Sequence, residues 1–214
     1  MPFDTYEIRT CRSCGLRYPW TNGNTFGERC PVCLGATDLT LRVRHKPDSD
    51  FTPEHSLERK GEFAVLLDNI RSAWNVGSIF RSADGFGFTH AYVCGITPTP
   101  ENEAVMKTSL GAEDTVTWSY HKDAVKLVQG LKNEGRQVWA LEEHERAVQL
   151  SASAHFNPPG PVILILGSEV TGVDPSLLDL ADKIFYISMY GEKTSFNVAT
   201  AFGIAAYQFT GLSS

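Results

Sequence analysis

The stretch Val162-Ile-Leu-Ile-Leu-Gly-Ser-Glu-Val-Thr-Gly172 decides the fold, because it joins an unbroken apolar run to a polar turn. Residues 162–166 are too few for a globular helix and rich in β-branched side chains, so they predict a buried strand. A second apolar run, Ile184-Phe-Tyr-Ile187, leads in the same way into a polar segment that ends at Asn197. Ligands of open α/β sheets bind outside the carboxyl ends of the strands. These two turns therefore predict a binding site.

Further strands and helices alternate before this stretch. Strands are predicted at 63–67, 91–94, 115–118 and 137–141, where apolar residues dominate short runs. Helices are predicted from an N-cap at Asn75 to Gly85 or Gly87, as a short turn at 106–113, and at 121–134. Two more follow Asp174-Pro175 and Asn197. Strands that alternate with helices indicate an α/β fold with a mostly parallel sheet.

Several common site motifs are absent. No G-x-G-x-x-G follows the first strand and no G-x-x-x-x-G-K-[ST] occurs, so neither a Rossmann dinucleotide site nor a P-loop is supported. No G-x-S-x-G occurs either. The sequence therefore points away from the best-known nucleotide-binding and hydrolase sites.

Charge is distributed unevenly along the chain. The formal net charge is -6, but residues 9–46 hold seven Lys or Arg and only two acidic residues. This pattern suggests a basic module attached to an acidic body, unless the excess in so short a segment is chance. A basic module would supply phosphate contacts that the body lacks.

Four cysteines of this module form the pairs Cys11-x-x-Cys14 and Cys30-x-x-Cys33. Two such turns can aim four thiolates at one point, and the spacing is typical of a structural Zn²⁺ site with no open position for catalysis. The alternatives are two disulfides or free thiols, and disulfides are disfavoured in a cytoplasmic chain. We therefore expect a Cys₄ zinc-ribbon-like module at residues 1–46.

Basic and aromatic residues fill the segment between the cysteine pairs. They can stack on bases and contact phosphates of RNA, or Tyr18 and Trp20 can instead pack the small core of the module. The residues are Arg17, Tyr18, Trp20, Asn22, Asn24 and Phe26.

The boundary between module and body is predicted at the polar, Pro-containing residues 47–61, which resemble a linker. The body is then 62–214. No apolar run approaches the ~20 residues that span a bilayer, and residues 1–7 lack a signal-peptide pattern, so we expect a cytoplasmic protein without membrane contact.

The body contains three polar segments with regular spacing, Asn75-x-G-x-x-x-Arg81, Leu166-Gly-Ser-Glu169-x-x-Gly172 and Ile187-x-Met-x-Gly-x-x-x-Ser195-x-Asn197. Together they resemble the motifs of the SpoU (TrmH-type) RNA methyltransferases. Ser109-x-Gly111-Ala112 is similar to an intervening motif of that family. The resemblance implies a SPOUT fold with a C-terminal trefoil knot, a homodimer, and methyl transfer from S-adenosylmethionine to a ribose 2′-OH of tRNA or rRNA.

The same resemblance implies roles for individual residues. Arg81 would act on the 2′-OH across the dimer interface, with Asn75, Glu169, Ser195 and Asn197 as further catalytic-site residues. Because a guanidinium stays protonated, Arg81 would position a phosphate and stabilise the developing alkoxide rather than act as a base. The residues implied to bind the cofactor are Leu166, Gly167, Gly172, Ile187, Met189, Ser195, Phe196 and Asn197.

The sequence departs from the family pattern at Ser168, Ser188 and Phe196, where Asn, Pro and Leu are usual. None of these changes removes a catalytic group, but they put the affinity for the cofactor in doubt. Two alternatives stay open. One is a SPOUT enzyme that methylates a base nitrogen, and the other is a non-catalytic RNA-binding protein that kept the fold.

Overall fold

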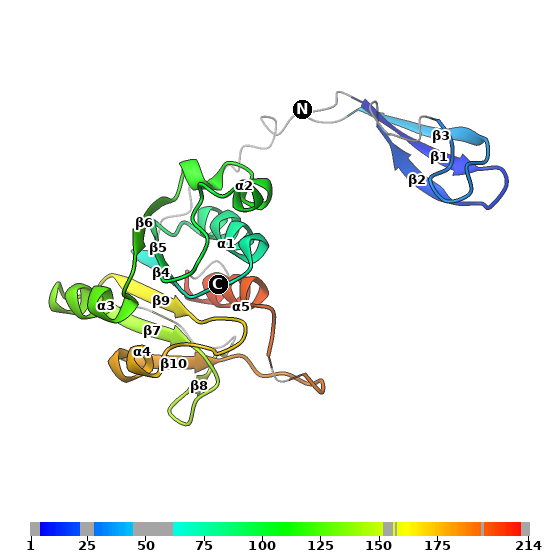
Figure 1. Cartoon of the computed structure of the whole chain (residues 1–214). Helices are drawn as coiled ribbons and strands as arrows, with labels where there is room; N and C mark the ends of the chain where they lie inside the picture. The colour runs from blue at the N-terminus through cyan, green and yellow to red at the C-terminus, as the bar shows by residue number, and fades with distance from the viewer. Residues whose placement is uncertain are drawn as a thin grey trace. The chain divides into compact units, whose positions relative to one another are not determined.

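The computed structural model describes residues 5–21, 28–44, 62–151, 156, 158–193 and 195–210. The chain separates into two compact units, residues 1–57 and 58–214, and each is described by itself (Figure 1). The predicted linker at 47–61, and Asn22, Asn24 and Phe26, lie outside the described residues. None of the helices in the described ranges combines the length and apolar character that a bilayer span requires.

The first unit is a three-stranded antiparallel sheet with the order β2-β1-β3. Its strands are β1 (Thr5–Cys11), β2 (Arg17–Trp20) and β3 (Thr37–Arg44). One face of β1 is buried and carries Glu7, Arg9 and Cys11. We call this unit the ribbon.

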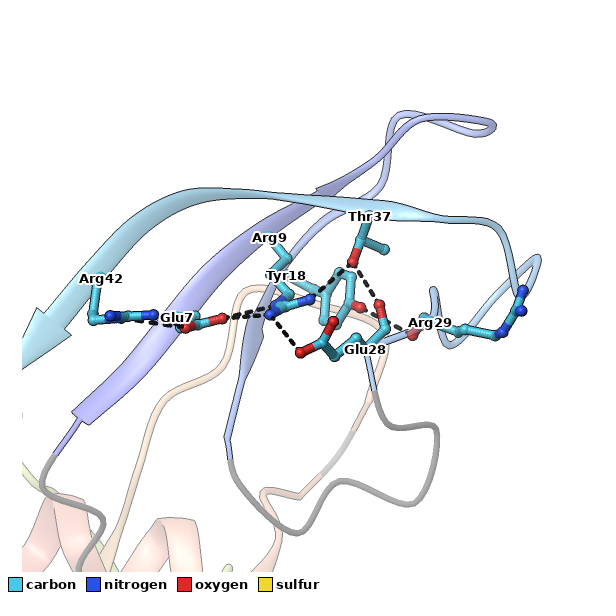
Figure 2. Close-up of polar contacts among 7 residues, drawn as sticks. All are labelled: Glu7, Arg9, Tyr18, Glu28, Arg29, Thr37 and Arg42. Carbon is cyan, nitrogen blue, oxygen red and sulfur yellow. Dashed lines mark hydrogen bonds and ion pairs between the residues drawn. The ribbon is translucent and has the colours of Figure 1, made fainter.

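A partly buried ion-pair network centred on Glu7 and Arg9 connects the strands of this unit (Figure 2). Arg9 Nε donates to Glu7 Oε2 at 2.8 Å, and Arg42 Nη2 donates to Glu7 Oε1 at 2.7 Å. The Arg9 guanidinium also lies 4.7 Å from the centre of the Trp20 ring. Arg42 and Arg9 together hold the pKa of Glu7 below its ordinary value. Tyr18 is buried and donates to the Arg29 carbonyl at 3.0 Å, so Tyr18 and Trp20 pack the ribbon.

The second unit is built on a seven-stranded sheet with the order β6-β5-β4-β9-β7-β10-β8, and every strand pair in it is parallel. We call this unit the body. The central strands β4 and β9 are buried along their whole length. The predicted α/β fold with a mostly parallel sheet is confirmed. The strands are β4 (Phe63–Asp68), β5 (His90–Cys94), β6 (Thr117–His121), β7 (Gln137–Leu141), β8 (Val148–Gln149), β9 (Val162–Leu166) and β10 (Lys183–Tyr186).

Helices cover both faces of this sheet (Figure 1). On one face, α1, α2 and α5 pack on alternate strand residues such as Val65 and Leu164. On the other face, α3 and α4 pack on the intervening residues such as Leu66 and Ile163. The helices are α1 (Ala73–Gly85), α2 (Glu103–Ser109), α3 (Ala124–Asn133), α4 (Pro175–Leu180) and α5 (Val198–Phe209), and a 3₁₀ turn η2 (Ala112–Asp114) follows α2.

Some predicted boundaries were wrong. The N-cap of α1 is Ser72, whose hydroxyl accepts from the Asn75 amide at 3.3 Å, and Asn75 lies inside the first turn. The third strand is shifted to 117–121 and the following helix starts after Asp123, which caps it. The predicted turn at 106–113 is a helix that ends at Ser109 followed by η2. The edge strand β8 was not predicted.

Candidate functional site

A cavity of about 490 Å³ opens at the carboxyl ends of β7, β9 and β10. Its wall includes all eight residues predicted to bind a cofactor, and also Glu169. The two polar turns that follow β9 and β10 therefore meet at one site, as the position of ligands in α/β sheets predicts.

Gly167 makes the tight turn after β9 possible. A Cβ atom at Gly167 would overlap the backbone of Gly172 and Val173. Ser168 and Gly172 exchange two backbone hydrogen bonds, Ser168 N to Gly172 O at 3.0 Å and Gly172 N to Ser168 O at 2.9 Å. Gly172 has a positive φ of 71°, which glycine adopts without strain. Residues 167–173, which we call the β9 loop, are thus closed on themselves.

Glu169 ties the β9 loop to the start of α1. Its carboxylate accepts from the amides of Arg71 at 2.8 Å and Ser72 at 3.1 Å, and from Asn75 Nδ2 at 2.8 Å. Partial burial would raise the pKa of Glu169, but these hydrogen bonds outweigh it and the pKa lies below its ordinary value. A carboxylate at a helix N-terminus is also favoured by the helix dipole.

Asn75 and Asn197 extend this connection to the second polar turn. Asn197 Nδ2 donates to Asn75 Oδ1 at 3.0 Å. Asn197 Oδ1 caps α5 by accepting from the amides of Ala199 at 3.0 Å and Thr200 at 3.3 Å. Glu169, Asn75 and Asn197, taken from three separate motifs, therefore form one continuous hydrogen-bonded network. Asn75 does not line the cavity but positions residues that do.

Arg81 lies apart from this cavity in its own chain. It is exposed on α1, six residues beyond Asn75, which corresponds to about 9 Å along the helix axis. Arg81 does not line the cavity, and within the described ranges no hydrogen bond or ion pair holds its guanidinium. The structure thus brings together Asn75, Glu169, Ser195 and Asn197 but not Arg81.

Gly77 and Ser109 belong to the sequence motifs but do not line the cavity. A Cβ at Gly77 would overlap Thr108 and the backbone of Val105, so this glycine lets α1 and α2 pack closely. Ser109 is buried and donates to the Val105 carbonyl at 3.1 Å.

Sequence reasoning missed the part of the cavity wall at the carboxyl end of β7. Leu141, Glu142 and Glu143 lie there, between the two polar turns that were predicted. The signal was present, because a polar pair directly follows the predicted strand 137–141. The other residues missed are Ser168, Val170, Tyr186, Val198 and Ala201.

The two strands that flank β9 each send a carboxylate to the end of the β9 loop. Glu142, after β7, accepts from the Val173 amide at 2.9 Å. Asp68, at the end of β4, is buried and accepts from the Asp174 amide at 3.1 Å. Burial raises the pKa of Asp68. The consecutive amides of Val173 and Asp174 are therefore held by carboxylates from β7 and β4, on the two sides of β9. These bonds preorganise the β9 loop, which lines the cavity.

The ribbon brings its four predicted cysteines together. Their sulfur atoms all lie within 4.8 Å of one another, with Cys11 and Cys30 buried. The Sγ atoms are 3.4 Å apart for Cys11 and Cys33 and 3.7 Å apart for Cys14 and Cys30. A disulfide would require about 2.05 Å. Tetrahedral zinc with bonds of about 2.3 Å places sulfurs about 3.8 Å apart, so the cluster fits a metal.

The turns around these cysteines place backbone amides near sulfur, although the neighbouring thiols of Cys11 and Cys14 raise the pKa of Cys33 to about 12. Leu34 and Gly15 have positive φ angles of 57° and 74°, as such tight turns require. The backbone amides of Cys14 and Ser13 lower the pKa of Cys11 to about 6. Backbone N–H groups that point at sulfur thus favour the charged form that binds metal ions.

Most of the arginines in the ribbon are already engaged. Arg9 and Arg42 pair with Glu7, and Arg12 Nε donates to Asp38 at 2.8 Å. Among the described arginines of the ribbon, Arg17 and Arg44 have no hydrogen bond or ion pair to their side chains, and Arg29 donates only to the uncharged Leu34 carbonyl. The charge excess read from the sequence therefore overstates the positive charge that is free to meet phosphate.

A comparison with protein-family models matches residues 62–207 to the SpoU rRNA Methylase family, over most of the chain. The chain belongs to the SpoU methylase family. The match covers most of the body and leaves the four clustered cysteines outside it.

Relatives of this SpoU protein are named as methyltransferases of different RNAs. It is 28% identical over 153 residues to a tRNA (guanosine(18)-2′-O)-methyltransferase of Aquifex aeolicus, which covers 71% of this chain and 70% of the relative. It is also 28% identical over 149 residues to the 23S rRNA (guanosine(2553)-2′-O)-methyltransferase RlmP of Bacillus subtilis, which covers 69% of this chain and 57% of the relative. The chain thus spans well under two thirds of some curated relatives.

Solved structures agree with the SpoU assignment. The TrmH/SpoU tRNA modifying enzyme of A. aeolicus matches with a TM-score of 0.63 and 26% identity, covering 72% of this chain and 77% of that one. The AdoMet-bound rRNA methyltransferase of Sinorhizobium meliloti matches with a TM-score of 0.64 and 25% identity, covering 78% and 60%. The seven-stranded parallel sheet is therefore the fold of this family.

Proposed function

We propose that this chain transfers a methyl group from S-adenosylmethionine to a ribose 2′-OH of tRNA or rRNA. The observation that carries the proposal is the cavity formed by the β9 loop and residues 187–197, the two segments that resemble family motifs. Family membership and the names of the relatives support the same reaction. One similar structure is described as AdoMet-bound.

The cavity fits a cofactor of this kind. A volume of about 490 Å³ is within the range of small-molecule sites. Leu166, Ile187 and Met189 offer apolar walls for an adenine ring, and Gly167 exposes backbone beside them. When bound, the cofactor would supply a methyl group made electrophilic by a sulfonium. The task of the protein is then to hold a ribose oxygen in line with that group.

The assignment of Arg81 is part of the proposal. The 2′-oxygen of the ribose attacks the methyl carbon, the bond from carbon to sulfur breaks with its electron pair left on sulfur, and the hydroxyl proton passes to phosphate or water. Arg81 remains protonated throughout and stabilises negative charge on the oxygen. Because Arg81 lies outside the cavity of its own chain, it would enter the cavity of a partner subunit in a homodimer.

The proposal also includes the division of the chain into domains and a structural metal. We infer that residues 62–214 form a knotted SPOUT methyltransferase domain, that 1–46 form a Cys₄ zinc module and that 47–61 connect them. Zn²⁺ would be structural, since four thiolates leave no open coordination position. RNA would meet the ribbon through few cations, with Arg17, Arg29 and Arg44 as the candidates.

Methylation of RNA tests the function directly. The purified protein should transfer label from S-adenosylmethionine to total RNA from a strain that lacks the gene, and the labelled nucleotide should resist alkaline hydrolysis on its 3′ side because its 2′-oxygen is blocked. Label on a base would instead favour the base-nitrogen alternative. Absence of both transfer and cofactor binding by calorimetry would favour a non-catalytic RNA-binding protein.

Metal content tests the ribbon. Metal analysis should give about one zinc per chain, and Cys30→Ser should lower it well below one, because a cluster of three thiolates binds zinc less tightly. Cys94→Ala is the matched control, since Cys94 is buried in β5 and lies outside the cluster. It should keep the zinc. A ribbon that stays folded without metal, seen by the dispersion of its amide signals in NMR, would contradict the assignment.

A further inference from the structure

Acidic side chains dominate the charge of the cavity wall. Glu142, Glu143 and Glu169 line the cavity, and no Lys, Arg or His is among the described residues that do so. The carboxylate of Glu169 already accepts hydrogen bonds from residues at the start of α1. The two carboxylates after β7 belong to no motif that the family resemblance used. A cavity wall of this charge favours a ligand that carries positive charge.

Glu142 is the fixed member of this pair. Its Oε2 accepts from the Val173 amide at 2.9 Å and its Oε1 from the Glu143 amide at 3.0 Å. Its own amide donates to the Phe185 carbonyl at 2.9 Å, which joins β7 to β10. No cationic side chain in the described part of the chain pairs with it. The carboxylate therefore holds one position on the wall with its negative charge uncompensated by a neighbouring side chain.

We propose that Glu142 makes the cavity selective for the cationic methyl donor over the neutral product of the reaction. This inference rests on the proposed function. Methyl transfer removes one positive charge from the cofactor, because the sulfonium becomes a thioether when its electron pair returns to sulfur. A fixed carboxylate attracts the sulfonium and has no such attraction for S-adenosylhomocysteine. Glu142 thereby helps fresh cofactor to displace spent cofactor.

The charge argument also predicts which kinetic constant Glu142 affects. The sulfonium charge is largest before the reaction and falls as the methyl leaves, so a carboxylate stabilises the ground state at least as much as the transition state. Removing the charge should therefore raise KM for S-adenosylmethionine without lowering kcat. A group that only held the loop in shape would change both constants and the affinity for product.

Calorimetry with the full-length protein measures this selectivity. Glu142→Gln removes the charge and keeps one oxygen that can accept from Val173, while the bond from the Glu143 amide is lost. We expect it to weaken S-adenosylmethionine binding roughly three- to tenfold, the effect of one partly solvated charge at several ångströms, and to leave S-adenosylhomocysteine binding within about twofold. Glu145→Gln is the matched control. Because Glu145 is exposed and does not line the cavity, S-adenosylmethionine binding should stay within about twofold of the wild type.

Ionic strength and a charged analogue complete the test. The preference of the wild type for S-adenosylmethionine should shrink between 50 mM and 500 mM salt, and that of Glu142→Gln should change less. An analogue with a protonated amine in place of the sulfonium should lose affinity in Glu142→Gln as S-adenosylmethionine does. Equal weakening of donor and product in Glu142→Gln, or no change in their ratio, would overturn the inference. A wild type that binds neither ligand would instead refute the proposed function.

Discussion

Replacing Arg81 by alanine should lower the rate of methyl transfer at least about a hundredfold while S-adenosylmethionine affinity stays within about twofold. Removal of one group that stabilises developing oxyanion charge typically costs a factor of 10² to 10³. Affinity should persist because Arg81 does not line the cavity of its own chain. Single-turnover methylation and calorimetry on the same preparation measure the two quantities.

Controls separate the role of Arg81 from a general loss of positive charge. Lys126→Ala removes an exposed cation from α3, on the opposite face of the sheet from α1, and should leave the rate unchanged. Arg81→Lys keeps the charge but loses the planar fork, so an intermediate rate is expected. A full rate in Arg81→Ala with cofactor bound would contradict the assignment.

Subunit mixing tests whether Arg81 acts across a dimer. An Arg81→Ala chain still has an intact cavity, and a chain with a damaged cavity still has Arg81. If the two act in trans, co-expression of both inactive chains should restore about a quarter of wild-type activity, because half of the dimers are mixed and each has one complete site. No recovery in mixed dimers would place Arg81 in its own site or remove it from catalysis.

The central strands could be predicted from sequence because burial on both faces leaves an unbroken apolar run. Residues 63–67 and 162–166 are such runs and lie in the buried strands β4 and β9. At the edges of the sheet this signal disappears. β6 was predicted at 115–118 rather than 117–121 because its residues are exposed or half-buried and form no apolar run. β8 consists of only two residues, Val148 and Gln149, and both are exposed.

Site residues could be predicted where a local sequence motif identifies them. They were missed where contacts between distant parts of the chain determine their position. Asn75 was taken as an N-cap because either Asn75 or Ser72 can cap a helix, and local preference does not choose between them. The choice is made by Glu169 and Asn197, which bind the Asn75 side chain from 94 and 122 residues away. The order of strands, which puts β7 beside β9 and Glu142 on the cavity wall, likewise depends on long-range pairing.

Replacing Gly167 by alanine should abolish most of the cofactor affinity, with a loss of more than tenfold. The added Cβ would overlap the backbone of Gly172 and Val173, and backbone atoms cannot move aside as a side chain can. The β9 loop would have to open, and it is fixed by Glu169 to α1 and by Glu142 and Asp68 at its exit. Overpacking of this kind also lowers the free energy of unfolding, by about 1–3 kcal/mol.

Gly191→Ala is the matched control, because among the described residues other than its chain neighbours no heavy atom lies within 4 Å of the Cβ position at Gly191, and its φ is not positive. It lies in the segment between Met189 and Ser195, which both line the cavity, yet it should bind S-adenosylmethionine within about twofold of the wild type. Calorimetry gives the affinities, and thermal unfolding with circular dichroism shows that each variant is folded at the temperature used. Equal affinities for the two variants would mean that the β9 loop does not form the cofactor site, because the tight turn at Gly167 is what places Leu166 and Gly172 on the same wall.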